Sequence, residues 1–147
     1  MMTMPIPSRF FLRLLWLCFA ALALGAQAVQ MGTAFLVCPE SAINAAYRAA
    51  LASATATDTV TTRTISGRPA RGIRNAMIDA LEPDEAAIPA YPVQNALTGA
   101  LRKLAGAAGD AQYLSLWAGQ GVAQARAIPA AALLQQLKDE WRAAGGQ

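Results

Sequence analysis

Four consecutive residues, Gln30, Met31, Gly32 and Thr33, carry the sharpest chemical signal in the chain. They stand at the far end of an apolar segment that predicts a buried strand. A glycine at such a point lets a ligand approach the backbone, because no Cβ intervenes. Free N–H groups and a threonine hydroxyl can hold phosphate oxygens, and a helix that follows adds a favourable dipole. The pattern predicts a phosphate site, although a plain strand-to-loop turn fits it as well.

The composition removes most other kinds of site. The chain has no histidine, which excludes Ser-His-Asp triads, Cys-His nucleophiles and histidine-ligated metals. Its two cysteines, Cys18 and Cys38, are too few for a disulfide scaffold or a cysteine-only zinc site. The net charge of +3 comes from scattered arginines, and the one cluster, Arg68, Arg71 and Arg74, holds no aromatic residue. We therefore expect no catalytic residue, no metal and no nucleic-acid partner.

The elements that must position Gly32 and Thr33 follow from hydrophobic patterning. The 147 residues are 55% hydrophobic and 14% charged, which excludes disorder, and 35 alanines favour helices. The continuous apolar run at 28–36 predicts a parallel strand buried on both faces. Thr-rich residues 55–65 predict an extended segment and 66–72 a loop. Helices are expected at 9–24, 41–54 (capped by Ser41), 73–81, 92–107 and 129–144. A parallel strand needs neighbours, and no other segment is a good partner, so the chain resembles the end of something larger.

The first 28 residues have the pattern of a secretory signal peptide. Arg9 precedes an apolar run at 10–26, and Ala26-Gln27-Ala28 matches a small-x-small cleavage site. The run also approaches the length of a membrane-spanning helix, and a buried helix is the third interpretation. Cleavage would discard Cys18 and leave Cys38 unpaired, which is uncommon in oxidising compartments. We therefore expect a cytoplasmic chain that keeps residues 1–28, without a membrane partner; export through this segment is the alternative.

Several motifs together resemble one known family. The segment AALALGAQAVQMGTAFL (20–36), followed by CPES (38–41), resembles the last barrel strand of the nitronate monooxygenases, formerly 2-nitropropane dioxygenases. The resemblance extends from residue 19 to the C-terminus, with the order and approximate spacing of the motifs retained. It continues through AYR (46–48), SGRPARG (66–72), YPVQNALT (91–98), GD (109–110) and SLWAGQG (115–121).

This resemblance implies an α/β fold in which the chain is a C-terminal fragment. Residues 19–55 would be the last helix–strand unit of a TIM-type (β/α)8 barrel, 56–147 a mostly helical substrate-domain region, and 1–18 an unrelated segment. The family binds FMN and oxidises alkyl nitronates with molecular oxygen. The resemblance implies that Gln30, Met31, Gly32 and Thr33 contact FMN, mainly at its phosphate end. It also places Tyr91 in the substrate pocket; a tyrosine packed on a helix start is the alternative.

The departures from the family pattern bear on activity. The family's Gly-Gly turn should fall near Phe10 and Phe11 and is absent, its catalytic base is a histidine that this chain lacks, and seven barrel strands are missing. The resemblance therefore implies a truncated portion with negligible nitronate oxidation of its own. Two alternatives remain: a small exported or membrane-anchored helical protein with a vestigial resemblance, and a phosphate-binding module without catalysis. The sequence predicts no oligomeric state.

Overall fold

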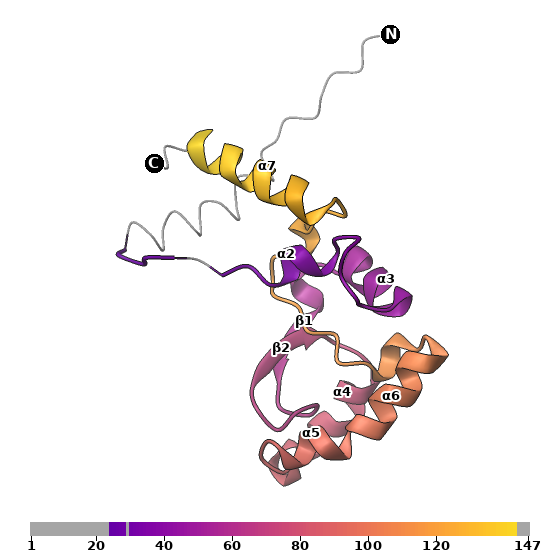
Figure 1. Ribbon diagram of the computed structural model, residues 1–147. Helices are drawn as coiled ribbons and strands as arrows, with labels where there is room; N and C mark the ends of the chain where they lie inside the picture. The colour runs from indigo at the N-terminus through magenta and orange to yellow at the C-terminus, as the bar shows by residue number, and fades with distance from the viewer. Residues whose placement is uncertain (1–23, 29, 144–147) are drawn as a thin grey trace.

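The computed structural model describes residues 24–28 and 30–143 (Figure 1). Most of the helix expected at 9–24, the segment 1–18 and Cys18 lie outside the described residues. The helices are α2 (Thr33–Leu36), α3 (Ala45–Ser53), α4 (Ala76–Leu81), α5 (Val93–Leu97), α6 (Gly99–Ala108) and α7 (Ala130–Ala143). Four short 3-10 helices join them: η1 (Ala56–Asp58), η2 (Glu82–Ala87), η3 (Ala111–Tyr113) and η4 (Val122–Gln124).

The only sheet among the described residues is a small antiparallel hairpin. Strand β1 (Thr59–Thr62) pairs with β2 (Ala70–Ile73), with Thr59 opposite Ile73. The segment between η3 and η4 continues the sheet on the other side of β2, because Ile73 N donates to Leu116 O at 2.8 Å and Ala118 N to Arg71 O at 3.1 Å. The expected extended segment 55–65 is confirmed over β1. The loop expected at 66–72 is wrong over its last three residues, which belong to β2.

Figure 1 shows how this hairpin connects two groups of helices. Helices α4, α5 and α6 lie at its lower end, and α2, α3 and α7 lie toward the other end. The chain leaves α6, returns along β2 and reaches α7. One hydrophobic cluster includes Leu51, Leu116 and Val122; a second contains Ile65, Met77 and Ile78. The hairpin therefore shares side chains with both clusters and joins the two ends of the molecule.

The strand predicted at 28–36 is wrong. Gln30 and Met31 adopt no strand, and Thr33–Leu36 form the short helix α2, in which Phe35 N donates to Gly32 O at 3.0 Å. A strand satisfies its backbone only through a neighbouring strand. Strand β2 is paired on both edges, with β1 and with the segment around Leu116, and no backbone hydrogen bond joins the described residues 30–36 to either strand. Because residues 33–36 pair with no strand, their backbone N–H and C=O groups are satisfied by hydrogen bonds within a helical turn.

The helices predicted at 41–54, 73–81, 92–107 and 129–144 are all present, but their ends differ from the prediction. Helix α3 is capped by Asn44, whose Oδ1 accepts from Tyr47 N at 2.8 Å, and not by Ser41. Asn75 caps α4 in the same way. The helix expected at 92–107 is divided at Thr98 into α5 and α6. Helices dominate the described chain as expected, and none of those helices is long and apolar enough to cross a membrane.

Candidate functional site

Three of the sequence motifs meet at one small cavity of about 310 Å³. Segment 30–33 contributes Gly32 and Thr33, the SGRPARG segment contributes Arg71, and the SLWAGQG segment contributes Trp117 and Gly119. Leu36 and Ala118 complete the lining. The hairpin makes this meeting possible, because β2 carries Arg71 and the segment at its side carries Trp117. Motifs that are far apart in the chain therefore form one surface.

A hydrogen bond joins two of these motifs directly. Gly119 N donates to Thr33 Oγ1 at 2.9 Å, across 86 residues of sequence. The threonine hydroxyl is an acceptor in this bond, so it retains its own hydrogen for a second partner. Thr33 is the first residue of α2, where a backbone N–H has no acceptor inside the helix. Thr33 can therefore offer a ligand two donors from one residue.

Gly32 leaves the backbone beside Thr33 open. A Cβ placed on Gly32 would meet no atom within 4 Å, and the residue is exposed. Gln30 is also exposed and Met31 is half-buried, and neither lines a described cavity. Of the four predicted cofactor residues, the structure thus places Gly32 and Thr33 at the cavity and leaves the other two beside it in sequence.

Arg71 brings a positive charge to the cavity. Its Nη1 donates to Thr59 O at 3.1 Å and to Thr59 Oγ1 at 3.2 Å, which holds the side chain along the hairpin. Its Nη2 and Nε donate to no acceptor in the described part of the chain. The structure shows the carbonyl pairing and also a guanidinium with donors left for an anion.

Tyr47 lies outside the cavity lining but holds one of the segments that form it. Its hydroxyl donates to Trp117 O across 70 residues, and burial raises the pKa of Tyr47 to about 12. The phenol therefore stays protonated, and remains a donor, at neutral pH. The tyrosine and Thr33 together hold the two ends of the segment from Trp117 to Gly119. The sequence predicted no role for Tyr47 or Gly119, although both stand in motifs that carry the family resemblance.

Tyr91 lies in another part of the molecule. It is 52% exposed just before α5, its ring has the Arg68 guanidinium carbon 5.9 Å from the centroid, and it lines neither described cavity. Gly67 makes this arrangement possible, because it has a φ of +84° and a Cβ there would come within 2.5 Å of Pro89 O and Tyr91 N. The structure therefore joins Tyr91 to the Arg68 loop and leaves its role in a substrate pocket a prediction.

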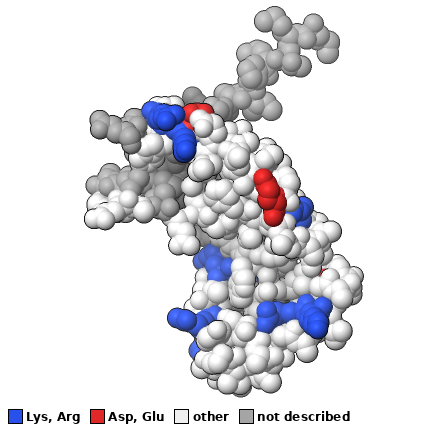
Figure 2. Space-filling model, in the orientation of Figure 1, with Lys and Arg blue, Asp and Glu red and all other residues white. Residues whose placement is uncertain are grey.

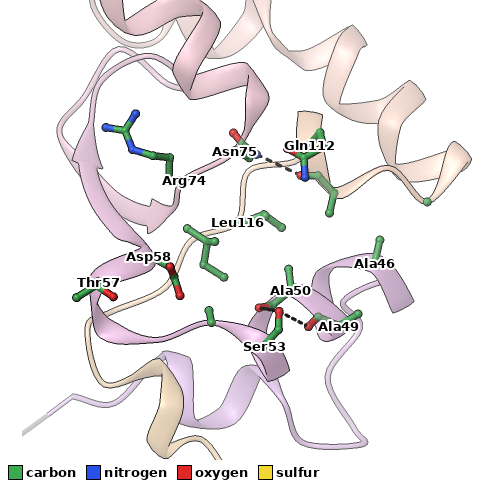
Figure 3. Close-up of a pocket in the computed structure, with 14 residues that line it drawn as sticks. Ala46, Ala49, Ala50, Ser53, Thr57, Asp58, Arg74, Asn75, Gln112 and Leu116 are labelled. Atoms are coloured by element: carbon green, nitrogen blue, oxygen red, sulfur yellow. Dashed lines mark hydrogen bonds between the residues drawn. The ribbon is translucent and has the colours of Figure 1, made fainter.

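A second cleft, of about 700 Å³, was not foreseen from the sequence (Figure 3). Alanines of α3 form one wall, and the side chains of Asp58, Arg74, Asn75 and Gln112 come from the opposite elements. These polar groups already have protein partners. Arg74 pairs with Asp79 at 2.6 Å and Glu82 at 2.8 Å, and Asn75 Nδ2 donates to two backbone carbonyls. The hydrogen bonds from Thr55 lower the pKa of Asp58.

Comparison with known proteins identifies the family. A sequence model described as nitronate monooxygenase matches residues 18–140. A nitronate monooxygenase of Pseudomonas aeruginosa is 52% identical over 84% of this chain and 35% of its own length. A probable nitronate monooxygenase of Staphylococcus saprophyticus is 45% identical over 80% of this chain and 33% of its own length. The chain thus spans about a third of the relatives that it matches.

Solved structures agree with these sequence matches. A nitroalkane oxidase from Streptomyces ansochromogenes superposes with a TM-score of 0.80 and 43% identity, over 87% of this chain and 36% of its own. FabK from Thermotoga maritima superposes with a TM-score of 0.68 and 30% identity, over 85% of this chain and 40% of its own. Both the sequence and the fold of this chain match one part of larger enzymes. The chain belongs to the nitronate monooxygenase family.

Proposed function

We propose that this chain is the C-terminal part of an FMN-dependent enzyme that oxidises alkyl nitronates with molecular oxygen. Residues 19–55 correspond in this proposal to the end of a flavin-binding TIM-type barrel, and 56–147 to the mostly helical substrate-domain region. Family membership supports the reaction class. Because the chain spans about a third of its relatives, the activity belongs to a longer protein or assembly in which this chain takes part.

The convergence of three motifs on the small cavity is the observation that carries the proposal. An FMN phosphate needs donors, a positive charge and a backbone that it can approach closely. The cavity offers the Thr33 hydroxyl and N–H, the remaining donors of Arg71, and open space over Gly32. The donor set therefore fits the phosphate end of the cofactor.

Within this proposal, bound FMN supplies the redox chemistry, and the residues of this chain hold and orient it. Thr33 would donate its hydroxyl and N–H to phosphate oxygens, and Arg71 would balance the phosphate charge. Trp117 and Leu36 give the cavity an apolar wall that limits water. Gln30 and Met31 precede Gly32 in the sequence, and by the family resemblance they would contact the cofactor as well.

Proton transfer at the substrate needs a group outside this chain. The resemblance assigns the catalytic base to a histidine, and the chain has none. Thr33 and Arg71 offer only a few hydrogen bonds, each worth about 1.5–3 kcal/mol to a charged phosphate. That is too little to offset the cost of immobilising a flavin on one side only. We therefore expect negligible nitronate oxidation from the chain alone.

Tyr91 belongs to the substrate side of this proposal. Its ring is half exposed and lies against Arg68, so one face remains open to a neighbouring part of the enzyme. A planar ring next to a guanidinium suits a small planar anion such as a nitronate. In the complete enzyme Tyr91 would line the pocket that receives it.

The test uses a two-part assembly. The full chain is co-expressed with the part of the P. aeruginosa relative that lies outside the match, and the purified material is assayed for flavin absorbance and oxygen uptake with a small alkyl nitronate. We expect flavin and turnover in the assembly and neither in the chain alone. Turnover by the chain alone at the rate of a complete enzyme would contradict the proposal that activity needs both parts. An assembly that binds no flavin would contradict the proposed cofactor.

We also propose that the chain functions in the cytoplasm with residues 1–28 retained. The family match begins at residue 18 and crosses the apparent cleavage point, which supports this. Mass spectrometry of the expressed chain should show residues 1–28 still attached; a mature protein beginning at Val29 would indicate export.

A further inference from the structure

Helices α5 and α6 present their large apolar side chains outward. Val93, Leu97, Leu101 and Leu104 follow one another at intervals of four, four and three residues, and are 54%, 66%, 42% and 70% exposed. Intervals of three and four place residues on one side of a helix. We refer to these four residues as the apolar face. Continuous exposed apolar surface of this kind marks a place where a protein contacts something else.

The inward side of α5 is polar as far as its junction with α6 at Thr98, whereas α6 buries Ala105. Gln94 and Thr98 are buried against the hairpin; Gln94 Nε2 donates to Thr64 O, and Thr98 Oγ1 donates to Ile65 O at 2.7 Å. A surface helix normally buries its apolar side and exposes its polar side. Here the order is reversed, and the reversal is fixed by buried hydrogen bonds that no rotation of the helices could keep. The outward apolar face is therefore suited to being covered.

We propose that the apolar face docks onto the part of the nitronate monooxygenase fold that this chain does not span. This inference rests on the proposed function only in its choice of partner. The P. aeruginosa relative and the Streptomyces structure are matched over 35% and 36% of their lengths, so most of the fold in those proteins is available to cover this face.

The charges next to the apolar face favour such a partner over a second copy. Helices α5 and α6 carry Arg102 and Lys103 and no acidic residue. Arg102 is turned back to Asn95, to which its Nη2 donates at 2.8 and 2.9 Å, whereas Lys103 is exposed. In Figure 2 the lower part of the molecule is mainly uncharged, and the charged side chains that it shows there are mostly basic. Two such faces would bring like charges together, while an apolar surface with acidic neighbours would complement them.

The test compares two leucines that receive the same substitution. Leu104→Glu places a charge on the apolar face, and Leu134→Glu places one on α7, where Leu134 is 48% exposed. Each variant chain is co-expressed with the tagged remainder of the P. aeruginosa relative, and the amount of chain that co-purifies is measured. We expect Leu104→Glu to reduce it about 10-fold or more, because a charge would be buried without a partner, and Leu134→Glu to change it little.

Further measurements keep the outcomes separate. Melting of the isolated chains should be the same for wild type and Leu104→Glu, because the leucine is exposed there. Light scattering that shows a wild-type dimer dispersed by Leu104→Glu would assign the face to a second copy and overturn the proposal. Binding to anionic phospholipid vesicles that Leu104→Glu abolishes would assign it to a membrane, and failure of the wild-type chain to co-purify would also overturn it. A complex that forms without flavin or turnover would leave the docking intact and contradict only the proposed function.

Discussion

The small cavity at Thr33 and the large cleft beside α3 differ in how their polar groups are bonded. In the cleft, Arg74 is held by two carboxylates and Asn75 by three backbone groups. In the cavity, less than half as large, Thr33 and Arg71 each have a protein partner and still hold donors in reserve. A polar group whose bonding is complete stabilises the fold, whereas one with a donor left over can bind a ligand.

This difference shows why size alone is a poor guide to a candidate binding site. The cleft is the larger space, but its walls are alanines of α3 and side chains that already serve helix caps and ion pairs. The cavity brings together three separated motifs and leaves open the backbone at Gly32. Substitutions in the cavity should therefore change cofactor binding, and matched substitutions elsewhere should not.

The largest effect is expected at Gly32. In the two-part assembly, Gly32→Leu should weaken FMN binding by about 100-fold or more, because its side chain would occupy the space of the phosphate. The folded chain itself should tolerate the change, since no atom lies within 4 Å of the new Cβ. Gly99→Leu is the matched control, because a Cβ at Gly99 also meets nothing within 4 Å. Flavin fluorescence titration measures the FMN affinity of both variants. An equal loss of affinity in the two would contradict a specific role for Gly32 in phosphate binding.

A smaller loss is expected when charge is removed. Arg71→Gln should weaken FMN binding in the assembly by about 10-fold, since a charged hydrogen bond to phosphate contributes about 1.5–3 kcal/mol. Arg74→Gln, in the large cleft, removes a guanidinium whose partners are exposed carboxylates and should leave the FMN affinity unchanged. The same titration measures the FMN affinity of both arginine variants. A loss from Arg74→Gln as large as that from Arg71→Gln would mean that general charge, and not the cavity, attracts the cofactor.

The hydroxyl of Thr33 should contribute to stability as well as to binding. Thr33→Val removes the acceptor of Gly119 N, and leaving that group unpaired should cost about 1–3 kcal/mol of unfolding free energy. Thr33→Ser keeps the hydroxyl and should therefore retain most of the unfolding free energy that Thr33→Val loses. Thr57→Val, in the large cleft, alters an exposed hydroxyl contact and should cost less than Thr33→Val. Urea unfolding of the isolated chain measures all three; a serine variant as unstable as valine would contradict the role of this hydrogen bond.

The smallest effect concerns alkaline pH. Burial raises the pKa of Tyr47 from 10.0 to about 12, so the folded chain keeps a proton that the unfolded chain loses. Stability should therefore fall as pH rises from 10 toward 12, and should show no such slope below pH 10. Tyr47→Phe should remove this slope, whereas Tyr113→Phe, at an exposed tyrosine, should not. Urea unfolding midpoints measured from pH 10 to 12 test this prediction. If the fall in stability is unchanged in Tyr47→Phe, a group other than Tyr47 causes it.

The sequence predicted the positions at the cavity better than their conformation. Gly32 and Thr33 were recognised from residue types that suit a phosphate, and such local chemistry needs no knowledge of the fold. The strand expected around them was wrong, because a strand depends on a partner elsewhere in the chain. Arg71 and Gly119 were visible as motif residues, but their meeting with Thr33 depends on the pairing of β2 with the segment at Leu116.

The helices likewise were predicted well where local sequence signals determine them and poorly where a contact with a distant residue does. The last helix, expected at 129–144, is confirmed as Ala130–Ala143, since Pro129 before it and the apolar spacing within it are local signals. The division of the helix expected at 92–107 was missed. Thr98, where it breaks, donates its hydroxyl to Ile65 O, a contact 33 residues away. The large cleft could not be foreseen either, because its walls come from three separate stretches of the chain, 46–58, 73–75 and 109–116.

The most direct test of the phosphate assignment compares FMN with riboflavin, which is the same flavin without the phosphate. Both are titrated against the two-part assembly, with the wild-type chain and with the double variant Thr33→Val and Arg71→Gln. We expect the wild type to bind FMN about 30-fold or more tightly than riboflavin, and the double variant to bind both with similar affinity. Equal affinity of the wild-type assembly for FMN and riboflavin, or a preference for FMN that survives both substitutions, would contradict the assignment of the cavity to the phosphate.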